Sequence, residues 1–312
     1  MTVLVVGAGL AGVAAGRTLR DAGVEVVLLD RGHRVGGRMA SRRTDGRVVD
    51  IGASYFTVSD PAFEAVVEDW RVRRLARPWT DTFSVADAGA LQPKPGPMRW
   101  AAPGGLRSLV EDLAVGLQVR EQTVHTVTPG LRVDGEPADA VVLAMPDPQA
   151  RRLLDPALAA AADALTDPFE PVLALTARWT EPIWPAIDGA FVGNDPILAW
   201  IADDGRRRGD SAPVLVAHST AEFAAEHLAA PQEAAPLMEL AVRDALGIAT
   251  EAVSTHLHRW TFGKPSGRRE DRYFLGDDLV GVCGDAWSDK PRVEAAYLSG
   301  VALGRALAQR LG

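Results

Sequence analysis

The chain has very little cysteine. Its 312 residues include a single one, Cys283, so neither an internal disulfide nor a cysteine metal site can form. Cys283 lies in the apolar run 279–283, and we expect it to be a packed core residue rather than a reactive thiol. An unpaired cysteine is typical of a reducing compartment, so we expect the protein in the cytoplasm.

Long apolar runs and an excess of positive charge are absent as well. No stretch approaches the roughly 18 apolar residues of a membrane helix, so we predict no membrane span. The first apolar stretch, Val3 to Val6, lacks a basic leader and is followed by glycines, which favours a strand over a signal peptide. The 33 basic and 41 acidic residues give a net charge of -8, which argues against a nucleic-acid partner.

The chain begins with the pattern of a dinucleotide-binding fold. The apolar run 3–6 precedes the glycine-rich turn 7–12, which opens a stretch of helical periodicity at 10–21; a second apolar run, 24–29, ends before Asp30. The glycines permit a tight turn and close approach of the backbone to a pyrophosphate, and Asp30 can accept hydrogen bonds from an adenosine ribose. The predicted contacts of this turn are Gly7, Gly9, Gly12 and Asp30.

Two further signals favour FAD over NAD, which shares the adenine half. The stretch 34–38 holds a glycine doublet that lets the backbone pass an extended cofactor, and Arg38 can donate to phosphate or flavin. The run 281–285 ends in Gly284 and Asp285, where a carboxylate can accept from ribityl hydroxyls. Ser288 or Asp289 is expected to cap the next helix, whose positive end can stabilise the reduced ring. Gly37 and Gly284 complete these two predicted sites.

The remaining pattern predicts an α/β protein of two domains. A Rossmann-type FAD-binding domain comprises residues 1–52, 101–165 and 275–312, and an inserted, mostly antiparallel β-sheet substrate domain comprises 53–100 and 166–274. Seven of the eight tryptophans fall in the insertions, where we expect them to fill a second core or line a pocket for a flat substrate. The stretches 92–97 and 203–213 are predicted to be surface loops.

The sequence resembles the renalase group within the flavin amine oxidase superfamily over nearly the whole chain. The matching stretches are Gly36–Met39, Asp50–Thr57, His258–Trp260, Gly284–Asp285 and Glu294–Gly300. By this resemblance His258 and Trp260 face the substrate, together with Tyr55, and these three are the expected catalytic residues. The FAD contacts that the resemblance implies are Ala11, Asp30, Arg31, Arg38, Ser54, Tyr55 and Asp285.

The expected function is that of an FAD-dependent oxidoreductase with a non-covalent cofactor. The resemblance implies oxidation of isomeric reduced nicotinamide dinucleotides, with dioxygen as acceptor and hydrogen peroxide as product. Stacking and orientation suffice for hydride transfer from a dihydropyridine, so no nucleophile is needed. The alternatives are a flavin amine oxidase or desaturase, an NAD-binding dehydrogenase, and a non-catalytic FAD-binding sensor or assembly module.

Two weaker patterns remain open. Only three lysines occur, and several superfamily members hold a water near the flavin with a lysine; Lys264 or Lys290 could do this, but a surface position is expected. His256 and His258 lie two apart in a probable strand and so share a face. No third ligand cluster accompanies them, so no metal site is predicted.

Overall fold

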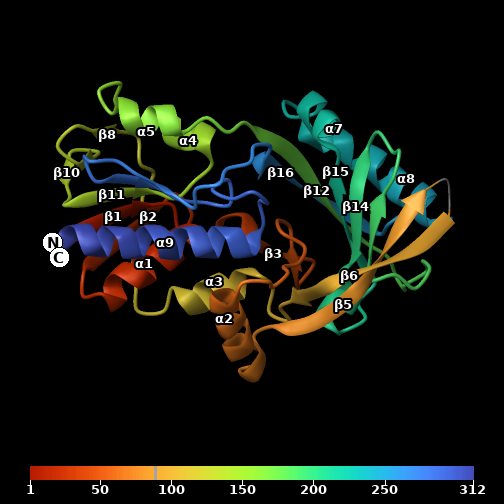
Figure 1. Ribbon diagram of the computed structural model, residues 1–312. Helices are drawn as coiled ribbons and strands as arrows, with labels where there is room; N and C mark the ends of the chain where they lie inside the picture. Colours follow the sequence, from red (N-terminus) through yellow and green to blue (C-terminus); the bar gives the residue numbers. More distant parts are fainter. Residues whose placement is uncertain (88–89) are drawn as a thin grey trace.

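The computed structural model describes residues 1–87 and 90–312 as two domains side by side (Figure 1). The first domain is built on a six-stranded sheet, parallel except at the β17 edge. Its order is β17 (Phe274–Leu275), β18 (Val280–Val282), β11 (Ala140–Leu143), β1 (Thr2–Val6), β2 (Glu25–Asp30) and β7 (Gln118–Glu121). This confirms the Rossmann-type half of the predicted fold.

Both faces of this sheet are covered, as its continuous apolar strands require. Val3 and Val5 of β1 pack with helices on one face, and Leu4 and Val6 pack with a second cluster on the other. The first face carries α1 (Leu10–Asp21), α2 (Pro61–Val72), α3 (Arg107–Leu113) and α9 (Val293–Leu311). The second carries α4 (Asp147–Arg151), α5 (Ala159–Ala164) and a small sheet of β8 (Val127–Thr128), β9 (Arg132–Val133) and β10 (Glu136–Pro137).

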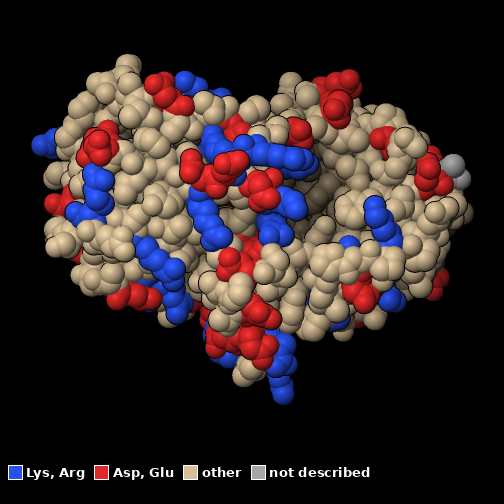
Figure 2. Space-filling view, viewed as in Figure 1, with Lys and Arg blue, Asp and Glu red and all other residues tan. Residues whose placement is uncertain are grey.

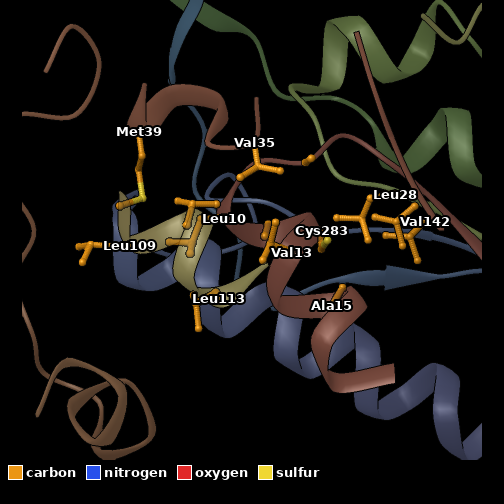
Figure 3. Packing of buried hydrophobic residues seen from close by; sticks show 14 of the residues in the cluster. Leu10, Val13, Ala15, Leu28, Val35, Met39, Leu109, Leu113, Val142 and Cys283 are labelled. Atoms are coloured by element: carbon orange, nitrogen blue, oxygen red, sulfur yellow. The ribbon is translucent and has the colours of Figure 1, made fainter. Parts of the chain in front are cut away.

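Cys283 belongs to the first of these clusters, among Val13, Leu28 and Val142 (Figure 3). Its side chain is fully buried, and burial raises the pKa of the thiol to about 12. The predicted role as a core residue is therefore confirmed.

The second domain is a seven-stranded sheet, antiparallel except where β13 meets β5. Its order is β16 (Ser254–Pro265), β12 (Phe169–Arg178), β15 (Val214–Ser219), β14 (Leu198–Asp203), β13 (Gly189–Val192), β5 (Arg77–Asp87) and β6 (Ala90–Ala101). One face packs into an apolar core with α7 (Ala221–Glu226) and α8 (Ala234–Leu246), near the short η2 (Pro231–Glu233). The other face is turned toward the first domain.

Three chain segments depart from the predicted organisation. Residues 92–97, expected to be a loop, belong to edge strand β6, where prolines are tolerated because one edge needs no ladder partner. The stretch 203–213 contains α6 (Asp204–Arg208), whose charged side chains are largely buried. Within 53–100, α2 packs in the first domain's core through Phe63, Val67 and Trp70, while β5 and β6 extend the second sheet.

Candidate active site

The glycine turn after β1 and the glycine doublet after β2 lie against each other. Gly9 forms a parallel bridge with Gly36, whose N–H donates to the Ala8 carbonyl at 2.9 Å. At Gly37, φ is +52°, and an added Cβ would lie 3.0 Å from the Gly9 Cα. Gly9 is also the N-cap of α1 and offers no side chain to its first N–H groups. Bare backbone at a helix N-terminus is an arrangement that binds phosphate oxygens.

Asp30 closes this turn from the end of β2. One carboxylate oxygen accepts from the Ala8 N–H at 2.7 Å, and the other accepts from the Gly32 N–H at 2.8 Å. The carboxylate therefore lies beside the glycine turn, and its oxygens have further lone pairs that could accept from a ribose, as the sequence predicts. Arg31 next to it is exposed, while Ala11 is buried within α1.

Arg38 and Asp285 form a two-pronged ion pair between distant parts of the chain. The Arg38 Nη1 donates to Asp285 Oδ2 at 2.9 Å and the Nη2 donates to Oδ1 at 2.6 Å. Arg38 also lies over the Phe169 ring, 5.3 Å from its centroid. A Cβ added at Gly284 would meet no atom within 4 Å, so the backbone there is open. The two predicted cofactor signals thus converge in space.

One stretch, residues 50–56, has contacts with both domains and is here called the crossing segment. Asp50 is held in the first domain by the Ser41 hydroxyl at 2.5 Å and the Leu106 N–H at 2.9 Å. The Ile51 and Ala53 N–H groups donate to the Ala40 and Arg38 carbonyls of the first domain at 3.1 and 2.9 Å. From the second sheet, Trp260 Nε1 donates to the Ile51 carbonyl at 2.6 Å. Ser54 Oγ accepts from Trp200 Nε1 at 3.1 Å.

Tyr55 follows directly and packs into a cluster of aromatic rings. Its ring centroid lies 5.0 Å from that of Phe83, 5.7 Å from Trp200 and 6.5 Å from Trp79. His258 and Trp260, 4.6 Å apart between ring centroids, come from β16 on the same side of the sheet. The structure therefore brings Ser54, Tyr55, His258 and Trp260 to the face that looks toward the first domain.

Two further residues, His218 and Trp200, lie on this face, and neither is among the site residues predicted from the sequence. His258 lies opposite Ala174, Ala174 opposite His218, and His218 opposite Trp200. Residues directly opposite in neighbouring strands project from the same face. The sequence shows only the period-two alternation within each strand, and this does not determine which strands pair or in which register.

The electrostatic surroundings of this face are set by arginines. Burial, and then Arg42, lowers the pKa of His258 to about 4. Burial, and then Arg207, does the same for His218, again to about 4. Burial raises the pKa of Tyr55 above its usual value, and Arg99 acts against that rise. Both imidazoles are therefore neutral near neutral pH, chiefly because they are buried.

The structure also places the two candidate lysines and the helix that follows Asp285. Lys264 and Lys290 are both exposed. The helix after Asp285 begins only at Val293, and its N-cap is Arg292 without a side-chain cap, so the predicted cap by Ser288 or Asp289 is wrong. Pro291 disfavours helical backbone at the residue before it, so a helix capped at 288 or 289 would be interrupted. Within 1–87 and 90–312, no three histidine, cysteine or acidic residues gather as metal ligands would, and no helix there is long and apolar enough to span a membrane.

A family model described as flavin containing amine oxidoreductase matches residues 76–303, and one described as an NAD(P)-binding Rossmann-like domain matches residues 5–70. The first match covers well over half of the chain, so the protein belongs to the flavin-containing amine oxidoreductase family. It is accordingly an FAD-dependent oxidoreductase, which confirms the expected cofactor and enzyme class. The glycine cradle, Asp30 and the open backbone at Gly284 fit such a dinucleotide.

Named relatives match only locally in sequence. Putrescine oxidase from Kocuria rosea is 42% identical over 67 residues, 22% of this chain and 14% of that protein. Polyamine oxidase 3 from Oryza sativa subsp. japonica is 46% identical over 54 residues, 17% of this chain and 11% of that protein. The matched region thus spans 11 to 14% of the length of these relatives.

Solved structures match over the whole chain. Cyclohexylamine oxidase from Brevibacterium oxydans IH-35A aligns with a TM-score of 0.77 at 16% identity, covering 99% of each chain. A putrescine oxidase bound to putrescine aligns with a TM-score of 0.73 at 17% identity, covering 100% of this chain and 99% of that one. At this identity the likeness establishes the fold alone.

Proposed function

We propose that the protein is a renalase-like oxidase that oxidises isomeric reduced nicotinamide dinucleotides and passes the electrons to dioxygen, giving hydrogen peroxide. FAD, when bound, supplies the hydride acceptor. The protein's own residues bind and orient the donor: Tyr55, His258 and Trp260 line the face toward the first domain. A compartment such as the cytoplasm suits a chain whose one cysteine is unpaired and buried.

The observation that carries this proposal is the charge around the aromatic face. Burial holds the imidazoles of His218 and His258 neutral, and the guanidinium that acts on His258 belongs to the exposed Arg42, whereas Arg207 beside His218 is buried in an ion pair with Asp204. The neutral imidazoles offer an alkylammonium substrate no counter-charge, and the exposed Arg42 would repel it. A reduced nicotinamide dinucleotide combines a neutral, flat ring for the aromatic side chains with an anionic pyrophosphate for the Arg42 guanidinium.

Access to this face agrees with a substrate that enters from solvent. Figure 2 shows a hollow between the two domains, with basic and acidic side chains gathered along its rim. The exposed Arg42 acts on His258 from the β3 (Ser41–Thr44) and β4 (Arg47–Asp50) hairpin, the neighbouring element of the first domain. We expect this arginine to meet the anionic part of the donor.

Anaerobic stopped-flow reduction of the bound flavin tests the proposal. The panel contains the isomeric reduced dinucleotides, ordinary reduced NAD, and putrescine and cyclohexylamine, the amines named by the relatives. We expect the isomeric dinucleotides to reduce the flavin fastest, and hydrogen peroxide to appear on reoxidation with dioxygen. Faster reduction by either amine would replace the proposal with amine oxidation, and failure of every donor would favour a non-catalytic FAD-binding module.

A further inference from the structure

Helix α6 of the second domain holds a group of buried charged side chains that contact the crossing segment. Asp204 and Arg207 are 0% exposed and Arg208 is 7% exposed. The Asp204 carboxylate accepts from Arg207, from the Arg208 Nε at 3.0 Å and from the Arg47 Nη2 at 2.8 Å. Burial alone would raise the pKa of Asp204, but the guanidiniums of Arg207 and Arg208 hold it below its usual range. The carboxylate is thus a fixed anchor.

This anchored group reaches the crossing segment at both ends. Arg208 lies 3.1 Å from the Asp50 carboxylate, at the start of the segment. Arg207 donates from Nη1 to the Ser54 carbonyl at 2.9 Å, at the peptide that precedes Tyr55. Arg207 Nη2 also lies 3.9 Å from the Asp50 carboxylate, but of the two arginines only Arg207 contacts Ser54. Asp50 also has partners in its own domain, whereas the contact of Arg207 is made next to an expected catalytic residue.

The shape of the guanidinium explains why one side chain can do both tasks. Arg207 uses Nε and Nη2 toward Asp204 and keeps Nη1 for the Ser54 carbonyl. Because the fork is planar and rigid, fixing two of its N–H groups also aims the third. Trp200 holds the same residue through the Ser54 Oγ, so both the carbonyl and the side chain of Ser54 are fixed from the second sheet.

We propose that Arg207 is a positioning residue: by fixing the Ser54–Tyr55 peptide plane it sets the tyrosine in the site. The inference rests on the proposed function only in that Tyr55 contacts the reacting groups, and it does not depend on which donor is used. A residue that merely stabilised the fold would change the amount of folded protein without changing the rate of each loaded site. A positioning residue changes that rate.

The test compares Arg207→Met with Arg206→Met. Arg206 lies on the same helix, but its guanidinium is half exposed and pairs with Asp188 at 2.9 Å, away from the crossing segment. Flavin reduction is measured per mole of bound FAD, with whichever donor reduces the wild-type protein fastest. We expect Arg207→Met to lower the limiting rate by about 10- to 100-fold, as displacements on the order of 1 Å do, and Arg206→Met to stay within about twofold.

Hydrogen exchange gives a second readout that needs no activity. We expect the amides of residues 50–56 to exchange at least about tenfold faster in Arg207→Met than in Arg206→Met, because opening of the segment no longer breaks the buried hydrogen bond. Arg207→Lys keeps the charge but not the fork, so it should restore only part of the protection. This arm also separates the inference from the proposed function, since it proceeds even if no donor reduces the flavin.

The charge-balanced double variant Arg207→Met, Asp204→Asn carries the same comparison if the single variant fails to fold. It removes one cation and one anion and leaves Arg208 with Asp50. Unchanged exchange across 50–56 in a folded Arg207 variant overturns the inference. So does accelerated exchange with an unchanged rate per bound flavin, because the arginine would then stabilise the segment without positioning Tyr55.

Discussion

His218 should make the stability of the protein depend on pH in a way that one substitution removes. Its ring is partly buried on β15, and the Nε2 atom is enclosed with no hydrogen-bond partner in the described residues. Burial, followed by Arg207, lowers its pKa from 6.5 to about 4. The native state therefore keeps this imidazole neutral at a pH where the unfolded chain takes up a proton.

The sign and size of the effect follow from linkage. Above about pH 6.5 the imidazole is neutral in both states and the free energy of unfolding has its full value. Between about pH 6.5 and pH 4 that free energy falls, because only the unfolded chain binds the proton. Below about pH 4 the native state binds it as well, so the free energy stops falling. For a single group with these two pKa values, the free energy of unfolding drops by about 2 kcal/mol between about pH 7 and pH 5. His258 has a similarly lowered pKa and adds a loss in the same direction.

The assay is urea unfolding of the apoprotein at these two pH values, followed by tryptophan fluorescence. His218→Gln removes the titrating group, so the drop in unfolding free energy between the two pH values should be about 2 kcal/mol smaller than in the wild-type protein. His33→Gln, at an exposed position, is the matched control and should keep the wild-type drop. Equal pH dependence in wild type and His218→Gln would refute the argument from burial.

Three other outcomes follow from the site. Acid precipitation should release free FAD into the supernatant, because the single cysteine is buried in the core; flavin retained in the pellet would contradict a non-covalent site. Asp285→Ala should weaken FAD binding by about 1.5 to 3 kcal/mol in a fluorescence titration, because it removes the carboxylate and frees the Arg38 side chain that the carboxylate orients. Asp277→Ala, at an exposed position, is the control. Unchanged FAD affinity in Asp285→Ala would remove Asp285 from the site. Arg42→Gln should raise the apparent Kd of the dinucleotide donor several-fold, and more at low salt than at high salt. Arg43→Gln, on the same strand, is the control and should leave the Kd unchanged. Equal increases in Kd for the two variants would argue against a specific contact of Arg42.

The nucleotide-binding half was predictable because its signals are local. A glycine-rich turn between a strand and a helix predicts positions that only glycine can occupy, as at Gly7 with φ +105° and Gly37 with φ +52°. The burial of Cys283 followed in the same way, from the apolar residues around it in one strand. The convergence of Arg38 and Asp285 was implied by two separate signals for one cofactor, although their direct ion pair was not.

The burial of the charged stretch 203–213 could not be predicted from its own residues. Its composition is typical of a solvated loop, but Asp204 and Arg207 are buried because partners arrive from elsewhere in the chain: Arg47 for the carboxylate and the Ser54 carbonyl for the guanidinium. A buried charge is tolerable only when such partners surround it. The sequence shows the charges but not the partners.

The aromatic face was decided in the same way by tertiary structure. Each strand's alternation determined which residues share a face, so the sequence by itself placed His258 and Trp260 together and set the glycine cradle for the cofactor. Whether His218 and Trp200 join them depends on the register of four strands and on the crossing segment that covers them. Register is fixed by the packing of the whole sheet, because a slip of one residue would turn every side chain of a strand to the opposite face.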